Sequence, residues 1–147
     1  MSLPVLGLDI GKATFHAVLL IGGKSLRRAL PNTPDGHAQL LSWLAQKSTE
    51  SVRACLEATG SYGQALARRL YQAGHLVSVV NPSRIKAFAR SAWERNKTDR
   101  RDAAIIARFC QVMQPELWTP PEPDEVLLQK LSRRRDDLKT KIGRAHV

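Results

Sequence analysis

The sequence predicts an α/β protein whose mixed sheet begins with a three-stranded antiparallel meander and is flanked by helices. Three apolar segments joined by glycine-containing turns fill residues 3–30, which is typical of a meander. Strand and helix patterns alternate after them, and this alternation calls for parallel strands joined by right-handed crossovers. Hydrophobic residues make up 43% of the 147-residue chain, which is enough for one domain with a buried core.

The meander is predicted from apolar runs over residues 3–11, 14–21 and 25–30. The first run ends at Gly11, and Gly22-Gly23 makes the tight connection between the second and the third. These short spacings favour antiparallel neighbours in one sheet.

Helix and strand patterns then alternate. Turn residues over 31–36 precede a helix whose leucine stripe continues to Lys47. A short apolar strand follows, and then a helix that is marked by Tyr62 and ends at Gly74, a favourable residue for a helix C-terminus. The two strands of this part are predicted over residues 52–57 and 75–80, and a basic segment over residues 84–97 comes after them.

A helix predicted over residues 97–113 carries two acidic residues on its apolar side. At about 100° per residue, Asp99 and Asp102 share a stripe with Ala103, Ile106, Cys110 and Met113. Because that stripe should face a core, the two carboxylates there are costly unless a positive group compensates them. The simpler alternative is that they cap the helix or favour its dipole.

Four carboxylates form a candidate metal site. Asp9 and Glu57 each stand at the C-terminal end of an apolar strand, the edge at which sites gather in α/β sheets. Together with Asp99 and Asp102 they would repel one another unless cations neutralise them. Mg²⁺ or Mn²⁺ takes oxygen ligands, and two such ions about 3.5–4 Å apart can clamp the attacking and leaving oxygens of a phosphodiester. We therefore predict a two-ion catalytic site built from these four residues.

The charge of the chain predicts a polyanionic partner. Its formal net charge is +10, which favours nucleic acid over a membrane surface. Basic residues are concentrated between positions 84 and 101, which favours contact with nucleic acid in this segment. The alternative is a solvated basic face that binds no partner. We expect the main nucleic-acid contacts among Lys12, Arg84, Lys86, Arg90, Arg95, Lys97, Arg100 and Arg101.

The same composition predicts the compartment and the state of the cysteines. No apolar run could span a membrane and no secretion signal opens the chain, so we expect a cytoplasmic, nucleoid-associated protein with no membrane partner. Cys55 and Cys110 lack metal-ligand spacing and lie in apolar contexts, which indicates buried free thiols.

Four motifs in one collinear order resemble the DEDD transposases of the Piv/MooV type, across roughly residues 5–113. They are Gly7-Leu8-Asp9-Ile10-Gly11-Lys12, Glu57-Ala58-Thr59-Gly60, Val80-Asn81-Pro82 and Lys97-Thr98-Asp99-Arg100-Arg101-Asp102-Ala103. These transposases are insertion-sequence recombinases of bacteria and archaea, so the resemblance implies a RuvC-like, ribonuclease-H-like fold. It also implies DNA as substrate, the same four acidic metal ligands, a structured guide RNA as in at least one branch, and a homo-oligomer for the full-length protein.

The resemblance also divides the chain. It implies a RuvC-like catalytic domain over residues 1–114, a proline-rich linker over 115–123 and the start of a helical, coiled-coil region over 124–147. Family members carry a nucleophilic serine on a further C-terminal domain that these residues do not include, so we expect no recombination by this fragment alone. Residues 142–147 are also what the start of a common sequencing adapter encodes, which suggests an artefact, with a natural tail as the alternative.

Two other functions stay open at this point. One is a stand-alone RuvC-like nuclease or Holliday-junction resolvase, and the other is a non-catalytic nucleic-acid-binding module. The fold alone does not choose among the three, because one fold can carry many functions.

Overall fold

A computed structural model describes residues 3–48, 50–58, 60–93 and 103–121. These residues form a five-stranded sheet of order β3-β2-β1-β4-β5. The strands are β1 (Val5–Ile10), β2 (Thr14–Ile21), β3 (Lys24–Pro31), β4 (Arg53–Glu57) and β5 (Leu76–Val80). The helices are α1 (Pro34–Lys47), α2 (Gln64–Gln72), α3 (Pro82–Trp93) and α4 (Ala103–Met113).

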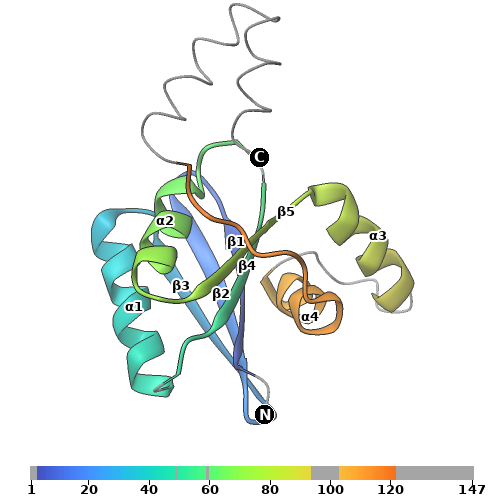
Figure 1. Cartoon of the computed structure of the whole chain (residues 1–147), viewed down its shortest axis with the longest axis horizontal. Coiled ribbons are helices and arrows are strands. Elements are labelled where there is room, and N and C mark those ends of the chain that lie inside the picture. The colour runs from blue at the N-terminus through green and yellow to red at the C-terminus, as the bar shows by residue number, and fades with distance from the viewer. Residues whose placement is uncertain (1–2, 49, 59, 94–102, 122–147) are drawn as a thin grey trace, which may run out of the picture.

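The sheet is mixed, as predicted. Strands β1, β2 and β3 pair antiparallel as a meander, whereas β4 pairs parallel with both β1 and β5. The helices α1 and α2 cover one face of the sheet, and α3 and α4 lie on the other (Figure 1). The three parallel strands therefore end together at one edge of the sheet, at Ile10, Glu57 and Val80.

Residue alternation along the strands builds a core on each face. Leu6, Leu8 and Leu56 are buried in the cluster that includes the apolar residues of α1 and α2. Val5 and Cys55 are buried in the second cluster, with the apolar residues of α4. Successive strand side chains point to opposite faces, so these two sets fix which face every other residue of β1 and β4 occupies.

Helix α1 begins at the turn that the sequence predicts. The Thr33 side chain accepts a hydrogen bond from the Gly36 backbone N–H at 3.1 Å, and Pro34 occupies the first turn, where no N–H is needed. Its stripe of Leu40 and Leu44 is buried against the sheet. The predicted extent to Lys47 is confirmed.

One predicted core position and the predicted start of one helix are wrong. Met113, expected on the buried stripe of α4, is 49% exposed. The rest of the predicted stripe, Ala103, Ile106 and Cys110, is buried, and so is Phe109, whose ring meets that of Phe88 on α3 edge-on with the ring centres 5.5 Å apart. Met113 is the last residue of α4 and Val112 before it is also exposed, so the packed part of the helix ends before these two residues. Tyr62, predicted to lie in a helix, precedes α2 and is 48% exposed.

The beginning of the basic segment is helical. Asn81 Oδ1 accepts hydrogen bonds from the backbone N–H of Ser83 at 2.8 Å and from the Ser83 hydroxyl at 2.9 Å. Pro82 follows directly and has no N–H to satisfy, so α3 starts as soon as β5 has ended. The part of the segment beyond α3 lies outside the described residues.

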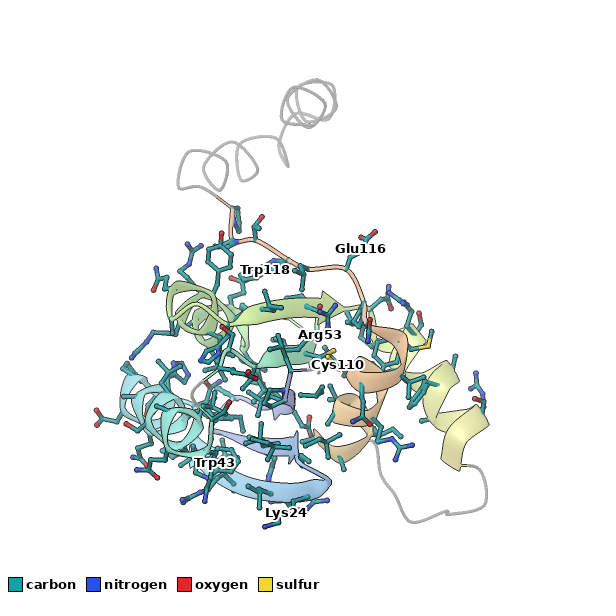
Figure 2. All side chains as sticks on the ribbon, turned by 60° about the horizontal axis from the view of Figure 1, so that its bottom comes forward. Lys24, Trp43, Arg53, Cys110, Glu116 and Trp118 are labelled. Atoms are coloured by element: carbon teal, nitrogen blue, oxygen red, sulfur yellow. The ribbon has the colours of Figure 1, made fainter. Side chains whose placement is uncertain are left out.

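Residues 114–121, which include most of the predicted linker, pack along β5. The Pro115 carbonyl accepts hydrogen bonds from Arg53 Nη2 at 3.0 Å and from the Ser78 hydroxyl at 3.2 Å. Farther along, the Trp118 backbone N–H donates to the Val77 carbonyl at 2.7 Å (Figure 2). The end of the predicted linker and the predicted coiled-coil region with its tail, residues 122–147, lie outside the described part.

The described helices include none with the length and apolar character that crossing a membrane requires. Cys55 and Cys110 are free and buried, as predicted. A hydrogen bond between the two thiols, together with burial, raises the pKa of Cys55.

The lowered pKa values of two histidines indicate that the protein is less stable in mild acid. Burial lowers the pKa of His37, with a further contribution from Arg69, and burial also lowers the pKa of His75. Below the ordinary value of 6.5 the unfolded chain therefore binds protons that the folded chain resists. We expect the free energy of unfolding to fall as the pH drops from 6.5 toward the folded-state pKa values. Urea unfolding at several pH values, with NMR titration of both imidazoles, measures this; either ring titrating above 6.5 would contradict it.

Candidate functional site

Asp9 and Glu57 lie at the same level on neighbouring parallel strands. The Cα pairing of β1 with β4 runs to Leu8 and Leu56, and the two acidic residues come next on each strand. Both side chains are partly buried. The prediction that strand ends bring these two residues to one edge of the sheet agrees with this register.

Both acidic residues occupy the sheet face that α4 covers. Gly7 and Cys55 stand two residues before them, and Cys55 packs in the cluster formed with α4. Because strand residues two apart share a face, Asp9 and Glu57 belong to that same face. Each of them also makes an interaction with its surroundings in the folded chain.

Gly7 allows α4 to lie directly on β1. A Cβ atom at this position would overlap the backbone oxygen of Ala103 and the backbone nitrogen of Ala107. Farther along α4, the Cys110 thiol lies 3.8 Å from the Arg53 carbonyl oxygen, at the opposite end of the sheet. Helix α4 therefore starts at the edge that holds the acidic residues and runs back across the sheet.

The direction of α4 bears on where the other two predicted ligands, Asp99 and Asp102, join the chain that the structure describes. Asp99 and Asp102 lie outside the described residues, as do Arg95, Lys97, Arg100 and Arg101. Asp102 immediately precedes Ala103, whose backbone packs against Gly7, and Gly7 is two residues from Asp9. Within the described ranges, no group of three or more His, Cys, Asp or Glu side chains could hold a metal ion. The four-ligand site remains a prediction.

The donor chemistry of the described pair fits a hard cation. Mg²⁺ and Mn²⁺ prefer oxygen ligands such as carboxylates. Asp9 and Glu57, the two residues of the predicted site that the structure describes, both supply carboxylate oxygens.

The predicted nucleic-acid contacts that the structure describes are exposed, but they are not equivalent. Lys12 lies in the turn after β1, and Lys86 and Arg90 are four residues apart on α3, so these two share one side of that helix. Arg84 instead places its guanidinium 5.3 Å from the centre of the Phe109 ring. Arg84 therefore also holds α3 against α4.

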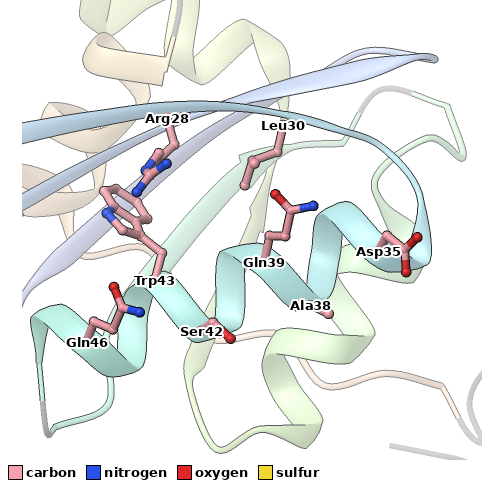
Figure 3. A pocket seen from close by; sticks show the side chains of 8 residues that line it. All are labelled: Arg28, Leu30, Asp35, Ala38, Gln39, Ser42, Trp43 and Gln46. Carbon is pink, nitrogen blue, oxygen red and sulfur yellow. The ribbon is translucent and has the colours of Figure 1, made fainter.

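A separate groove of about 460 Å³ lies between α1 and the edge strand β3 (Figure 3). Arg28 covers the Trp43 ring there, with its guanidinium carbon 5.5 Å from the ring centre. The lining has one basic and one acidic residue, Arg28 and Asp35, and includes neither Asp9 nor Glu57. Its balanced charge does not suit a polyanion.

Sequence reasoning missed two residues that shape the site. Gly7 belongs to the first motif, but its close contact with α4 is not predicted there. The available signal is its position inside a buried strand, where a glycine often marks the close approach of another backbone. Asn32 lies in the turn before α1, and its amide donates hydrogen bonds to the carbonyls of Gly11 and Tyr62, both at 2.9 Å. Turn chemistry alone gives no sign of those distant partners.

Comparison with known proteins gives consistent similarities. A family profile described as "Transposase", for DEDD transposases of the IS110 type, matches residues 6–147. The chain is 33% identical over 144 residues to the pilin gene-inverting proteins of Moraxella lacunata and Moraxella bovis, covering 97% of this chain and 45% of each relative. It is 28% identical over 141 residues to the transposase for insertion sequence element IS1328 of Yersinia enterocolitica, covering 93% of this chain and 38% of that protein.

A solved structure shares the fold. RuvC of T. thermophilus, in complex with a Holliday junction substrate, superposes with a TM-score of 0.52 at 16% identity, covering 76% of this chain and 96% of that chain. This similarity confirms the predicted RuvC-like, ribonuclease-H-like fold. The chain spans less than half the length of the curated relatives it matches.

Proposed function

This chain belongs to the IS110-type DEDD transposase family, and from that premise we propose that it is the metal-binding catalytic domain of a DNA transposase or site-specific recombinase. The observation that carries the proposal is the placement of Asp9 and Glu57 side by side on the face covered by α4. The start of α4 beside Gly7 supports a site completed by Asp99 and Asp102.

In this proposal, Asp9, Glu57, Asp99 and Asp102 hold two Mg²⁺ or Mn²⁺ ions. When bound, the ions would supply charge stabilisation for the attacking and leaving oxygens of a DNA phosphodiester. The four carboxylates would hold the ions, and the strand register of β1 and β4 sets where the first two lie on the sheet. The attacking oxygen comes from a serine on a further domain, as the resemblance to the Piv/MooV type implies.

Further partners belong to the same proposal. The net charge of +10 supports DNA as substrate and is equally suited to a structured guide RNA. We place the full-length protein in the bacterial or archaeal cytoplasm, associated with the nucleoid, as a homo-oligomer. The relatives' names, a pilin gene-inverting protein and an insertion-sequence transposase, support action on DNA.

Mg²⁺ is expected to stabilise the folded chain. An ion that binds only the native state stabilises it by about 2.7 kcal/mol at a hundredfold excess over its Kd, because of mass action. Thermal unfolding with and without Mg²⁺ should show a shift of several degrees in the wild type and a much smaller one in Asp9→Asn. Without metal, Asp9→Asn should unfold at a higher temperature, since it relieves carboxylate repulsion.

The matched control for that measurement is Asp35→Asn, which removes an exposed carboxylate from the first turn of α1. It should retain the full Mg²⁺ shift. A wild type that melts identically with and without saturating Mg²⁺ would contradict the proposed metal site.

Exposed cations on α3 are expected to contact nucleic acid. Because Pro82 follows β5 closely, α3 begins near the edge that holds Asp9 and Glu57. The double variant Lys86→Glu/Arg90→Glu should weaken DNA binding for unrelated sequences. It should also flatten the salt dependence, whose slope is about −0.9 per phosphate contacted on duplex DNA.

The control for this variant is Lys24→Glu/Arg27→Glu, which makes the same change in charge on the exposed edge strand β3. Filter binding or fluorescence anisotropy at several salt concentrations separates a local contact from a general loss of charge. Equal losses in both double variants would contradict a specific role for α3.

A further inference from the structure

The chain segments that follow β1 and β4 are joined through the side chain of Asn32. Its Nδ2 donates to the carbonyl oxygens of Gly11 and Tyr62 at 2.9 Å each. Gly11 is two residues beyond Asp9, and Tyr62 is five residues beyond Glu57. One amide group therefore spans the two loops that leave the acidic strand ends.

Both the nitrogen and the oxygen of the Asn32 side-chain amide have hydrogen-bond partners. Both hydrogens of Nδ2 go to the two carbonyl oxygens, so Oδ1 is the atom that faces His37 Nε2, at 2.7 Å. An amide oxygen only accepts, and His37 Nε2 must therefore carry the hydrogen. His37 is 4% exposed, and its ring lies 6.0 Å from that of Phe15, so a buried group fixes the orientation of the Asn32 amide.

The Asn32 hydrogen bonds lie next to the two acidic residues along the chain. Parallel pairing between β1 and β4 reaches Leu8 and Leu56, the residues just before the two acidic ones. The Asn32 bonds then connect the same two chain segments just past the acidic residues. We infer that Asn32 is a positioning residue, held by His37, that sets the spacing of Asp9 and Glu57. The role in metal binding rests on the function proposed above.

The test uses Asn32→Asp, which keeps the shape of the side chain but replaces the donor with an acceptor. A carboxylate oxygen would then face two carbonyl oxygens. Binding of Mn²⁺ alone to the 147-residue chain, measured by calorimetry below the unfolding temperature of each variant, should weaken roughly tenfold, as for other groups that orient metal ligands.

Two controls separate positioning from charge and from general stability. Asn81→Asp adds the same charge at the same edge of the sheet but keeps its role as acceptor for Ser83. An added negative charge favours cation binding, so only the lost bonds can account for weaker binding in Asn32→Asp. Thr33→Ala removes the α1 cap next to Asn32 without touching either loop, and it should leave Mn²⁺ affinity unchanged.

Hydrogen exchange provides a readout that does not need the metal. Amides in residues 11–14 and 60–63 should exchange faster in Asn32→Asp than in Thr33→Ala. Normal Mn²⁺ affinity in Asn32→Asp, beside a wild type that binds Mn²⁺, overturns the inference and leaves the proposed function standing. A wild type that binds no Mn²⁺ overturns the proposed metal site. In that case hydrogen exchange tests whether Asn32 joins the two loops: faster exchange in both loops of Asn32→Asp supports this role, and unchanged exchange overturns it.

Discussion

Asp9→Asn or Glu57→Gln in a full-length recombinase that carries this domain is expected to lower DNA strand exchange by at least about 10³-fold. Metal ions at a phosphodiester contribute several kcal/mol of charge stabilisation in the transition state, and each 1.36 kcal/mol is a factor of ten in rate. Both substitutions preserve side-chain shape, so folding should be retained. Recombination of a plasmid substrate, with circular dichroism as the folding check, measures the effect.

The same assay distinguishes the alternatives. Asp35→Asn, which changes an exposed carboxylate of α1, should recombine at the wild-type rate. The 147 residues alone, incubated with supercoiled plasmid and Mn²⁺, should give neither joined product nor a covalent protein–DNA adduct. Slow nicking that Asp99→Ala abolishes would favour a stand-alone nuclease. Unchanged recombination in Asp9→Asn and Glu57→Gln would contradict catalysis by these residues.

The fold was predictable because its signals are local. Apolar runs separated by glycine turns define the meander, and strand–helix alternation requires β4 and β5 to run parallel to β1. The end of each apolar run marks where Asp9 and Glu57 stand, so their common edge follows from the direction of the strands. No contact between distant residues is needed for any of these steps.

The remaining features depend on contacts between distant segments. Met113 is exposed because it is the last residue of α4, beyond the part of the helix that packs, and helical periodicity cannot report where that packing ends. Arg84 looks like any basic residue until its contact with Phe109 is known. Asn32 likewise reads as a turn residue, although it joins two loops that precede and follow it in the chain.

Gly7→Ala is expected to destabilise the protein by about 3 kcal/mol or more, which lowers the unfolding temperature by on the order of 10 °C. The added methyl group would overlap the backbone oxygen of Ala103 and the backbone nitrogen of Ala107. Neither atom can rotate away, so α4 must move off β1. Gly11→Ala is the matched control, because among the described residues its new Cβ would approach the Thr14 oxygen alone, at 3.2 Å. That variant should lose less than about 1 kcal/mol.

The double variant Gly7→Ala/Ala107→Gly tests the cause. Removing the Ala107 side chain leaves the backbone atoms where they were, so we expect no recovery of stability. Recovery, or a Gly7→Ala variant as stable as Gly11→Ala, would show that α4 does not press on β1 through its backbone. Displacement of α4 should also reduce the Mg²⁺ shift in unfolding temperature, because the helix that begins next to Asp102 would no longer start beside Asp9.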